Sequence, residues 1–266
     1  MLTAITRNVS PSFASCQLEF LKRSEMDVAR AAAQHREYEA CLERLGARVF
    51  SLPSLPEYPD CVFVEDPALV LDEIAIATRM GAESRRGEIE SLAGALAHFR
   101  PVLRLREPAT LEGGDVVRMG KTLYVGLSRR TNAEGIRQLE DIVGPMGYQV
   151  IPVPVMGCLH LKSACCAVAD DTVLMNPELI DPANIRVSRI LSVPAEEPWA
   201  ADSLRIGDTV LLPSSFPRTK QLLEANGFVV LAIDVSELQK AEAGITCMSL
   251  IFDSDHPLPY LDRSFH

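Results

Sequence analysis

The sequence has 266 residues, of which 47% are hydrophobic and 23% charged, and its net charge is −10. This composition predicts a globular protein with a large core, and the acidity argues against nucleic acid or an anionic membrane as the main partner. The seven cysteines are scattered and odd in number, which indicates reduced thiols in a cytoplasmic protein. No signal peptide or membrane span is expected, because Arg7 precedes any apolar run and no such run approaches about 18 residues.

One structural unit recurs along the chain: a helix, a short strand, an irregular loop and a tight hairpin. Helices are predicted at residues 25–45, 84–99, 133–146 and 219–226, and single strands at 48–52, 102–105, 149–153 and 189–193. Two-residue turns are predicted for the hairpins at Asp72-Glu73, Gly120-Lys121, Asp170-Asp171 and Gly207-Asp208. The hairpins recur about every 37 to 50 residues, a period that is typical of repeat architectures.

The fifth copy of this unit is predicted to be split between the two ends of the chain. Residues 228–233 would supply its first strand, 248–252 its second, and 2–6 the missing partner, so that the ends meet and close a ring. We therefore predict one α/β domain over residues 1–266, a five-fold pseudosymmetric α/β-propeller with strands around a central channel and helices outside. The helices argue against a propeller of four-stranded blades, and the hairpins argue against a doubly wound parallel sheet.

Polar residues gather in the irregular loops that precede the hairpins. Asp60, Glu65 and Asp66 lie among apolar neighbours, which fits a cation-binding wall as well as it fits turn carboxylates. In the second loop Glu112 and Asp115 flank two glycines, which permits close approach of a ligand or simply marks a bulge.

The remaining loops hold a histidine and a cysteine that have both a functional and a structural interpretation. His160 stands between two leucines, and a lone histidine is more often structural than catalytic. Cys247 lies where a turn enters an apolar strand, a place for a nucleophile or for a small core residue. Arg85 and Arg130 follow the first two hairpins, where their guanidinium groups would bind a carboxylate ligand or form surface ion pairs.

Taken together, these loops resemble those of the guanidine-modifying (pentein) superfamily, and within it the dimethylarginine dimethylaminohydrolase family. The resemblance covers nearly the whole chain, and the tail 253–266 adds nothing to it. The segments that carry it are residues 5–12, 63–66, 82–86, 111–115, 126–132, 157–163 and 246–247.

The resemblance implies a role for each matching residue. Cys247 would be the nucleophile, His160 the general acid and base, and Glu112, where the family often has aspartate, the carboxylate that orients His160. The substrate-binding residues would be Leu18 as a closing residue, Asp60, Glu65 and Asp66 around the guanidinium and α-amino groups, Phe63 on the guanidinium plane, Arg85 and Arg130 on the α-carboxylate, and Ala241.

The implied reaction is hydrolysis of N-ω-methylated arginine to citrulline and methylamine or dimethylamine, through a covalent thiouronium intermediate on Cys247. The resemblance implies no metal and no cofactor; the partner is a small-molecule substrate, and a homodimer is compatible with it. Three alternatives stay open: deimination of unmethylated arginine or a related guanidine, a silent methylarginine sensor, and zinc bound to Cys247 and His160 as an inhibitor.

Overall fold

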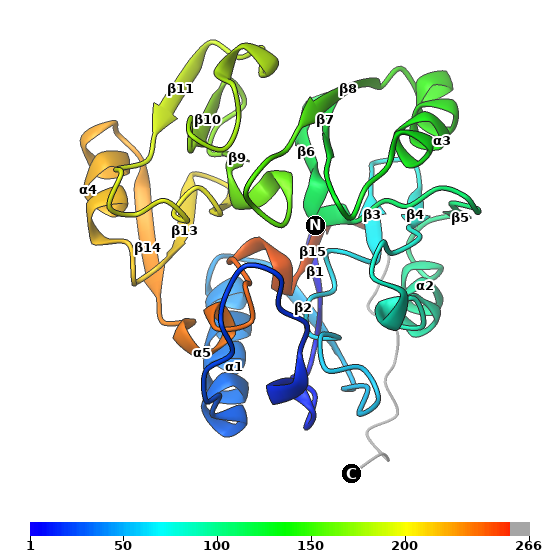
Figure 1. Cartoon of the computed structure of the whole chain (residues 1–266), viewed down its shortest axis with the longest axis horizontal. Coiled ribbons are helices and arrows are strands. Elements are labelled where there is room, and N and C mark those ends of the chain that lie inside the picture. The colour runs from blue at the N-terminus through cyan, green and yellow to red at the C-terminus, as the bar shows by residue number, and fades with distance from the viewer. Residues whose placement is uncertain (256–266) are drawn as a thin grey trace.

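The computed structural model describes residues 1–255 and contains five three-stranded sheets arranged in a ring (Figure 1). The predicted α/β-propeller is therefore confirmed, whereas residues 256–266 of the predicted domain lie outside the described part. The sheets are β15 (Leu250–Asp253), β1 (Leu2–Arg7) and β2 (Arg48–Leu52); β3 (Ala68–Val70), β4 (Ala75–Ala77) and β5 (Val102–Arg104); β6 (Val116–Met119), β7 (Thr122–Leu127) and β8 (Gln149–Pro154); β9 (Cys165–Ala167), β10 (Thr172–Met175) and β11 (Arg189–Ser192); and β12 (Leu204–Ile206), β13 (Thr209–Pro213) and β14 (Val229–Ile233).

Each sheet is built in the same way. An inner strand pairs antiparallel with a second strand, a crossover follows, and a third strand returns parallel to the second. The five inner strands β3, β6, β9, β12 and β15 all contribute residues to a central cavity. The helices lie at the outside of the ring (Figure 1), and they are α1 (Val28–Arg44), α2 (Ile89–Leu96), α3 (Ala133–Val143), α4 (Pro217–Ala225) and the short α5 (Ser236–Gln239).

The two ends of the described chain meet in one sheet, as predicted. β1 pairs antiparallel with β15, with Leu2 opposite Asp253, and parallel with β2 on its other side. The Tyr38 hydroxyl on α1 and the Ser249 hydroxyl are 2.6 Å apart in the core, which fixes the start of β15 against the first helix. The segment that carries Cys247 is thus held at the point where the ring closes.

Two predictions about the strands were wrong. The first error came from grouping each single strand with the hairpin that follows it. Residues 228–233 were assigned to the fifth unit, but β14 pairs parallel with β13 in the sheet that the fourth hairpin, β12 and β13, begins. The strand predicted at 248–252 begins only at Leu250, because Thr246–Met248 form a 3-10 turn. The strand after each crossover completes the sheet of the preceding hairpin, so the repeating unit is ββαβ.

The helix predicted at 84–99 was also wrong at its start, since Glu83–Arg85 form a 3-10 turn and α2 begins at Ile89. Two tertiary contacts explain the difference. The Arg85 guanidinium is buried against the carbonyls of Asp60 and Phe63, and Gly87 packs so closely on Tyr58 that a Cβ atom there would lie 1.8 Å from the tyrosine oxygen. Local helix propensity yields to these contacts.

Other helix ends follow their sequence signals. Asp27 caps α1 by accepting from the Arg30 N–H, and Asn132 caps α3 by accepting from the Gly135 N–H. In the sheet of β9, β10 and β11 the crossover between β10 and β11 holds the 3-10 turn Pro182–Asn184 in place of an α-helix. Among residues 1–255, no helix combines the length and hydropathy needed to cross a membrane.

Candidate active site

The candidate residues lie at equivalent points of the ring, just before an inner strand begins. Asp66 precedes β3, Glu112 precedes β6, His160 precedes β9 and Cys247 precedes β15. We call these positions the entries of the inner strands. They come together at one end of the central channel, where a cavity is lined by Asp66, His160 and Cys247. Glu112 lies behind His160 and has no exposed surface. The pseudosymmetry of the fold thus brings together residues that are up to 181 positions apart in the chain.

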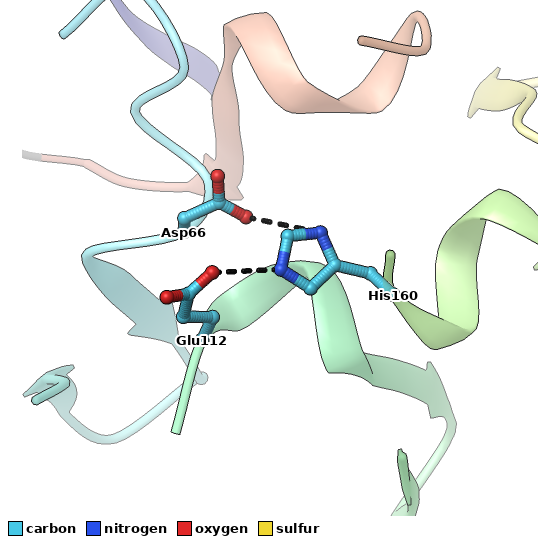
Figure 2. A group of neighbouring side chains, drawn as sticks. All are labelled: Asp66, Glu112 and His160. Carbon is cyan, nitrogen blue, oxygen red and sulfur yellow. Dashed lines mark hydrogen bonds and ion pairs between the residues drawn. The ribbon is translucent and has the colours of Figure 1, made fainter. Parts of the chain in front are cut away.

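His160 is held between two carboxylates (Figure 2). Its Nε2 atom lies 2.7 Å from Oε2 of Glu112, and its Nδ1 atom lies 3.7 Å from Oδ1 of Asp66. The other Glu112 oxygen accepts from the Ala82 N–H, and the Arg130 guanidinium donates to both oxygens at 3.2 and 3.3 Å. Glu112 therefore has the donors it needs to remain a carboxylate in the interior.

This arrangement favours the protonated histidine. Burial opposes a charge on His160, but Asp66, the hydrogen bond to Glu112 and Asp115 outweigh it and raise the pKa of His160 to about 9. For Glu112, burial opposes the charged form, but the hydrogen bond and the charge of His160, together with Arg130 and Arg85, outweigh burial and lower the pKa to about 2. At neutral pH the pair is an imidazolium with a carboxylate, which has a proton to give.

The raised pKa of His160 predicts a pH-dependent stability. A folded-state pKa of about 9 against an ordinary value of 6.5 stabilises the fold fully below pH 6.5, and this contribution is lost as the pH rises towards 9. The difference in the free energy of unfolding between the wild-type protein and His160→Asn should fall by on the order of 3 kcal/mol over this range, at about 1.4 kcal/mol per pKa unit. Urea unfolding of both proteins between pH 6 and 10 measures the difference, and a constant difference would contradict the charged state.

Cys247 lines the same cavity. Its Sγ atom accepts from the Gly244 N–H at 3.4 Å, and the Cys247 carbonyl accepts from the Glu65 N–H. Burial raises the pKa of this thiol well above its ordinary value, and Asp202, Glu65 and Asp66 raise it further. Without a ligand Cys247 is therefore a neutral thiol, and a cation in the cavity would favour its ionisation.

One oxygen in the cavity lacks a hydrogen-bond donor among the described residues. Oδ1 of Asp66 is buried and makes no hydrogen bond, whereas Oδ2 accepts from Arg85 at 2.7 Å. A buried carboxylate oxygen without a donor is costly, so a ligand with N–H groups would bind favourably here. A guanidinium has five such N–H groups and a positive charge.

The other predicted carboxylates already have internal partners. Glu65 is ion-paired with Lys162 at 2.5 Å and accepts from the Thr246 hydroxyl at 2.8 Å. Both oxygens of Asp60 accept from the Gln17 N–H at 3.2 Å. Asp115 accepts from the N–H of Leu161, so that it fixes the backbone next to His160 and has no place in the cavity lining.

The two candidate arginines differ in how their nitrogens are used. Arg85 is bound to both oxygens of Glu88, to Asp66 and to two backbone carbonyls, so that all its nitrogens have partners. Arg130 donates from Nε to Glu19 at 2.7 Å and from Nη1 to Glu112. Both arginines line the cavity, and Arg130 is the one that is held by a residue of the N-terminal loop.

That loop closes the cavity. Glu242 accepts from three successive N–H groups of Glu19, Phe20 and Leu21 at 2.5 to 3.1 Å. The closed cavity has a volume of only about 20 Å³, enough for a water molecule but not for an amino acid, so the loop has to move when a substrate enters. The predicted closing residue Leu18 packs against the core and is half-buried, and its neighbour Gln17 is the one that lines the cavity.

The remaining predicted residues, Phe63 and Ala241, are buried and line the cavity. Sequence reasoning missed Lys162, Glu242 and Asp202 as lining residues. Asp202 precedes inner strand β12 and thus occupies the entry of the fourth unit. Its position before the fourth hairpin was the signal that could have revealed it, since the other four entries had been recognised.

Asp66, Glu112 and His160 also form a group whose ligand atoms lie within 4.8 Å of one another, a spacing compatible with a metal ion. The geometry fits an imidazolium better. Each ring nitrogen of His160 points at a different carboxylate (Figure 2), whereas metal ligands would direct their lone pairs at one common point.

The fold and this site define a class of proteins, the five-bladed α/β-propellers with a polar site at one end of the central channel. Similarity in fold alone extends to the N-terminal domain of ArgZ, an arginine dihydrolase, with a TM-score of 0.83 at 18% identity. Residues 11–193 match the family model described as N,N dimethylarginine dimethylhydrolase, eukaryotic. The chain belongs to the dimethylarginine dimethylaminohydrolase family.

Individual relatives agree with this membership. The dimethylarginine dimethylaminohydrolases of Pseudomonas aeruginosa and Streptomyces coelicolor are 37% and 38% identical to the chain, over 85% and 93% of its length and 90% and 95% of theirs. A cysteine-to-serine variant of the Pseudomonas enzyme in complex with citrulline superposes with a TM-score of 0.90 at 35% identity, covering 95% of this chain and all of that one. A dimethylarginine dimethylaminohydrolase adduct with S-methyl-L-thiocitrulline gives a TM-score of 0.89.

Proposed function

We propose that this protein hydrolyses N-ω-methylated arginine to citrulline and methylamine or dimethylamine. The observation that carries the proposal is the Glu112–His160 hydrogen bond of 2.7 Å beside a cysteine in a cavity walled by carboxylates. The family supports the choice of substrate, because relatives bear the name of this activity and one has been crystallised with citrulline. Residues 1–266 are proposed to act as a single catalytic domain in the cytoplasm.

Substrate binding is the step that prepares the nucleophile. The guanidinium would donate to Oδ1 of Asp66, which makes no hydrogen bond, and lie against Phe63, while the α-carboxylate would bind Arg130 in place of Glu19. The incoming positive charge offsets the carboxylates that hold the Cys247 pKa high, so the thiol releases its proton to solvent only when substrate is present.

Hydrolysis then takes place in two halves. The Cys247 thiolate forms a C–S bond to the central guanidinium carbon, and the C–N bond to the methylated nitrogen breaks as His160 gives its proton to the leaving amine. The neutral His160 next accepts a proton from water, and the resulting hydroxide attacks the thiouronium carbon. The C–S bond then breaks as the added hydroxyl group gives its proton to the departing sulfur, which releases citrulline and restores the neutral thiol beside a protonated His160. One water molecule is consumed, and no electrons are exchanged.

Release of citrulline from monomethylarginine, asymmetric dimethylarginine and unmethylated arginine tests the proposed function. Methylated substrates should give citrulline with equal amounts of methylamine or dimethylamine. Ammonia from arginine as the preferred reaction would instead support a deiminase, and binding without any citrulline would support a silent sensor.

The variant Arg130→Ala is expected to raise KM by about 10- to 100-fold, with a smaller effect on kcat. A charge-assisted bond to the α-carboxylate is worth about 1.5–3 kcal/mol and exists in both the ground state and the transition state. Steady-state kinetics with monomethylarginine measures the effect, and Arg129→Ala, one position earlier in the same loop, is the matched control. An unchanged KM would remove Arg130 from the proposed site.

A further inference from the structure

A second cavity lies directly beside the catalytic one. Its volume is about 320 Å³, within the size range of pockets that take small molecules. Five residues line both cavities, so the two share a wall; they are Leu159, Ser163, Asp202, Glu242 and Ala243. The other walls are largely apolar and consist of Phe20, Leu21, Trp199, Pro213 and Phe216, together with Ser215 and Gln239.

A single residue, Gly244, separates the second cavity from Cys247. Gly244 lines this cavity, and the N–H of the same glycine donates to Sγ of Cys247 at 3.4 Å. A side chain could not be accommodated here, because a Cβ atom on Gly244 would lie 1.9 Å from the Asp202 carboxyl group. Gly244 therefore packs directly on the Asp202 carboxyl group, and the rest of the boundary between the two cavities is formed by Leu159, Ser163, Glu242 and Ala243.

Asp202 stands at the boundary with spare hydrogen-bonding capacity. It is 4% exposed, its Oδ1 atom accepts from the Thr246 N–H at 3.0 Å, and Oδ2 has only the Thr246 hydroxyl at 3.4 Å. That hydroxyl makes its shorter bond to Glu65, and Lys162 is also paired with Glu65. Asp202 has no ion pair with a cation in residues 1–255, so Oδ2 can accept an N–H of an alkylated guanidinium nitrogen. Burial and Glu65 raise the pKa of Asp202 to about 7, which a bound cation would reverse.

The roof of the second cavity is held in place when the loop is closed. Phe20 and Leu21 are exposed apolar side chains, and their N–H groups are the ones that Glu242 binds. Closure of the loop thus completes the polar catalytic cavity and the apolar second cavity in the same movement.

We propose that the second cavity binds the alkyl substituent on the ω-nitrogen, so that the substrates include N-ω-alkylarginines with three- or four-carbon groups. This inference rests on the proposed function. The reaction is unchanged in kind: water and N-ω-propylarginine give citrulline and propylamine, with cleavage of the bond between the guanidinium carbon and the alkylated nitrogen. Each methylene buried in the cavity should improve binding up to about fourfold.

The test compares N-ω-methyl- and N-ω-propyl-L-arginine on the full-length protein. We expect a kcat/KM for the propyl compound equal to or up to about tenfold above that for the methyl compound. Ser215→Phe, which places a ring in the second cavity only, should lower kcat/KM for the propyl compound at least tenfold and change the methyl value less than twofold. Ser214→Phe is the matched control, since Ser214 is also exposed but does not line the cavity, and should affect neither.

Binding to the Cys247→Ser variant, measured by calorimetry, gives a second readout that does not depend on turnover. The propyl compound should bind as tightly as the methyl compound or up to tenfold more tightly. With Ser215→Phe added, the propyl compound should bind more weakly than the methyl compound. If methylarginine is hydrolysed but the propyl compound binds tenfold more weakly, or if Ser215→Phe affects both compounds equally, the subsite is wrong and the proposed function stands. If neither compound yields citrulline, the proposed function fails, and the binding ratio still decides the subsite.

Discussion

Cys247→Ser is expected to bind methylarginine but to lose at least four orders of magnitude in kcat. A serine hydroxyl has the size and position of the thiol but does not ionise near neutral pH, and the surrounding carboxylates oppose its ionisation further. His160 is protonated in the resting enzyme, so it cannot serve as a base for the hydroxyl. The rate of citrulline release measures the loss, and calorimetry shows whether the substrate still binds.

The matched control is Cys41→Ser, which changes a buried thiol on α1 outside the cavity lining. This variant should lower the melting temperature and leave kcat within a few-fold of wild type, because a hydroxyl in an apolar core destabilises the fold without touching the site. Activity in Cys247→Ser above 1% of wild type would place the nucleophile elsewhere among the cysteines.

The predicted ring and the predicted triad came from different kinds of information. Two-residue turns such as Gly120-Lys121 are local features, so the hairpins could be placed from the sequence, and their recurrence implied a ring that closes between β1 and β15. No local feature distinguished Cys247 from a core cysteine or His160 from a structural histidine. Only the resemblance to a family gave these residues roles, and the structure then placed them at equivalent entries.

What the sequence could not reveal depends on contacts between distant residues. Arg85 looked like the first turn of a helix, but its ion pairs with Asp66 and Glu88 are formed only in the folded core. The high pKa of Cys247 likewise comes from burial and from three carboxylates supplied by two other units. The contact between Glu19 and Arg130 joins residues 111 positions apart and depends on the closed loop. In the proposed function these features decide when Cys247 ionises and where a substrate carboxylate binds, and none of them follows from local sequence.

The second large effect is expected for Glu112→Gln, which should lower kcat by about 10²- to 10⁴-fold, the usual contribution of general acid–base catalysis. The amide keeps the size of the side chain but removes its charge, and with it part of the electrostatic stabilisation that raises the His160 pKa to about 9. The pKa of His160 then falls, and less of it is protonated when the amine leaves. The high-pH limb of the kcat profile should therefore move to lower pH.

The direction of that shift separates this role from a structural one. Glu112→Asp keeps the charge and should retain the position of the high-pH limb even if kcat falls, because a shorter arm lengthens the 2.7 Å contact. Glu197→Gln is the control for losing a buried carboxylate, since Glu197 caps α4 through the N–H groups of Arg218 and Thr219 and should affect only stability. A high-pH limb that stays in place in Glu112→Gln would mean that Asp66 and Asp115 alone set the charge of His160, and Glu112 would then act only by orienting the ring.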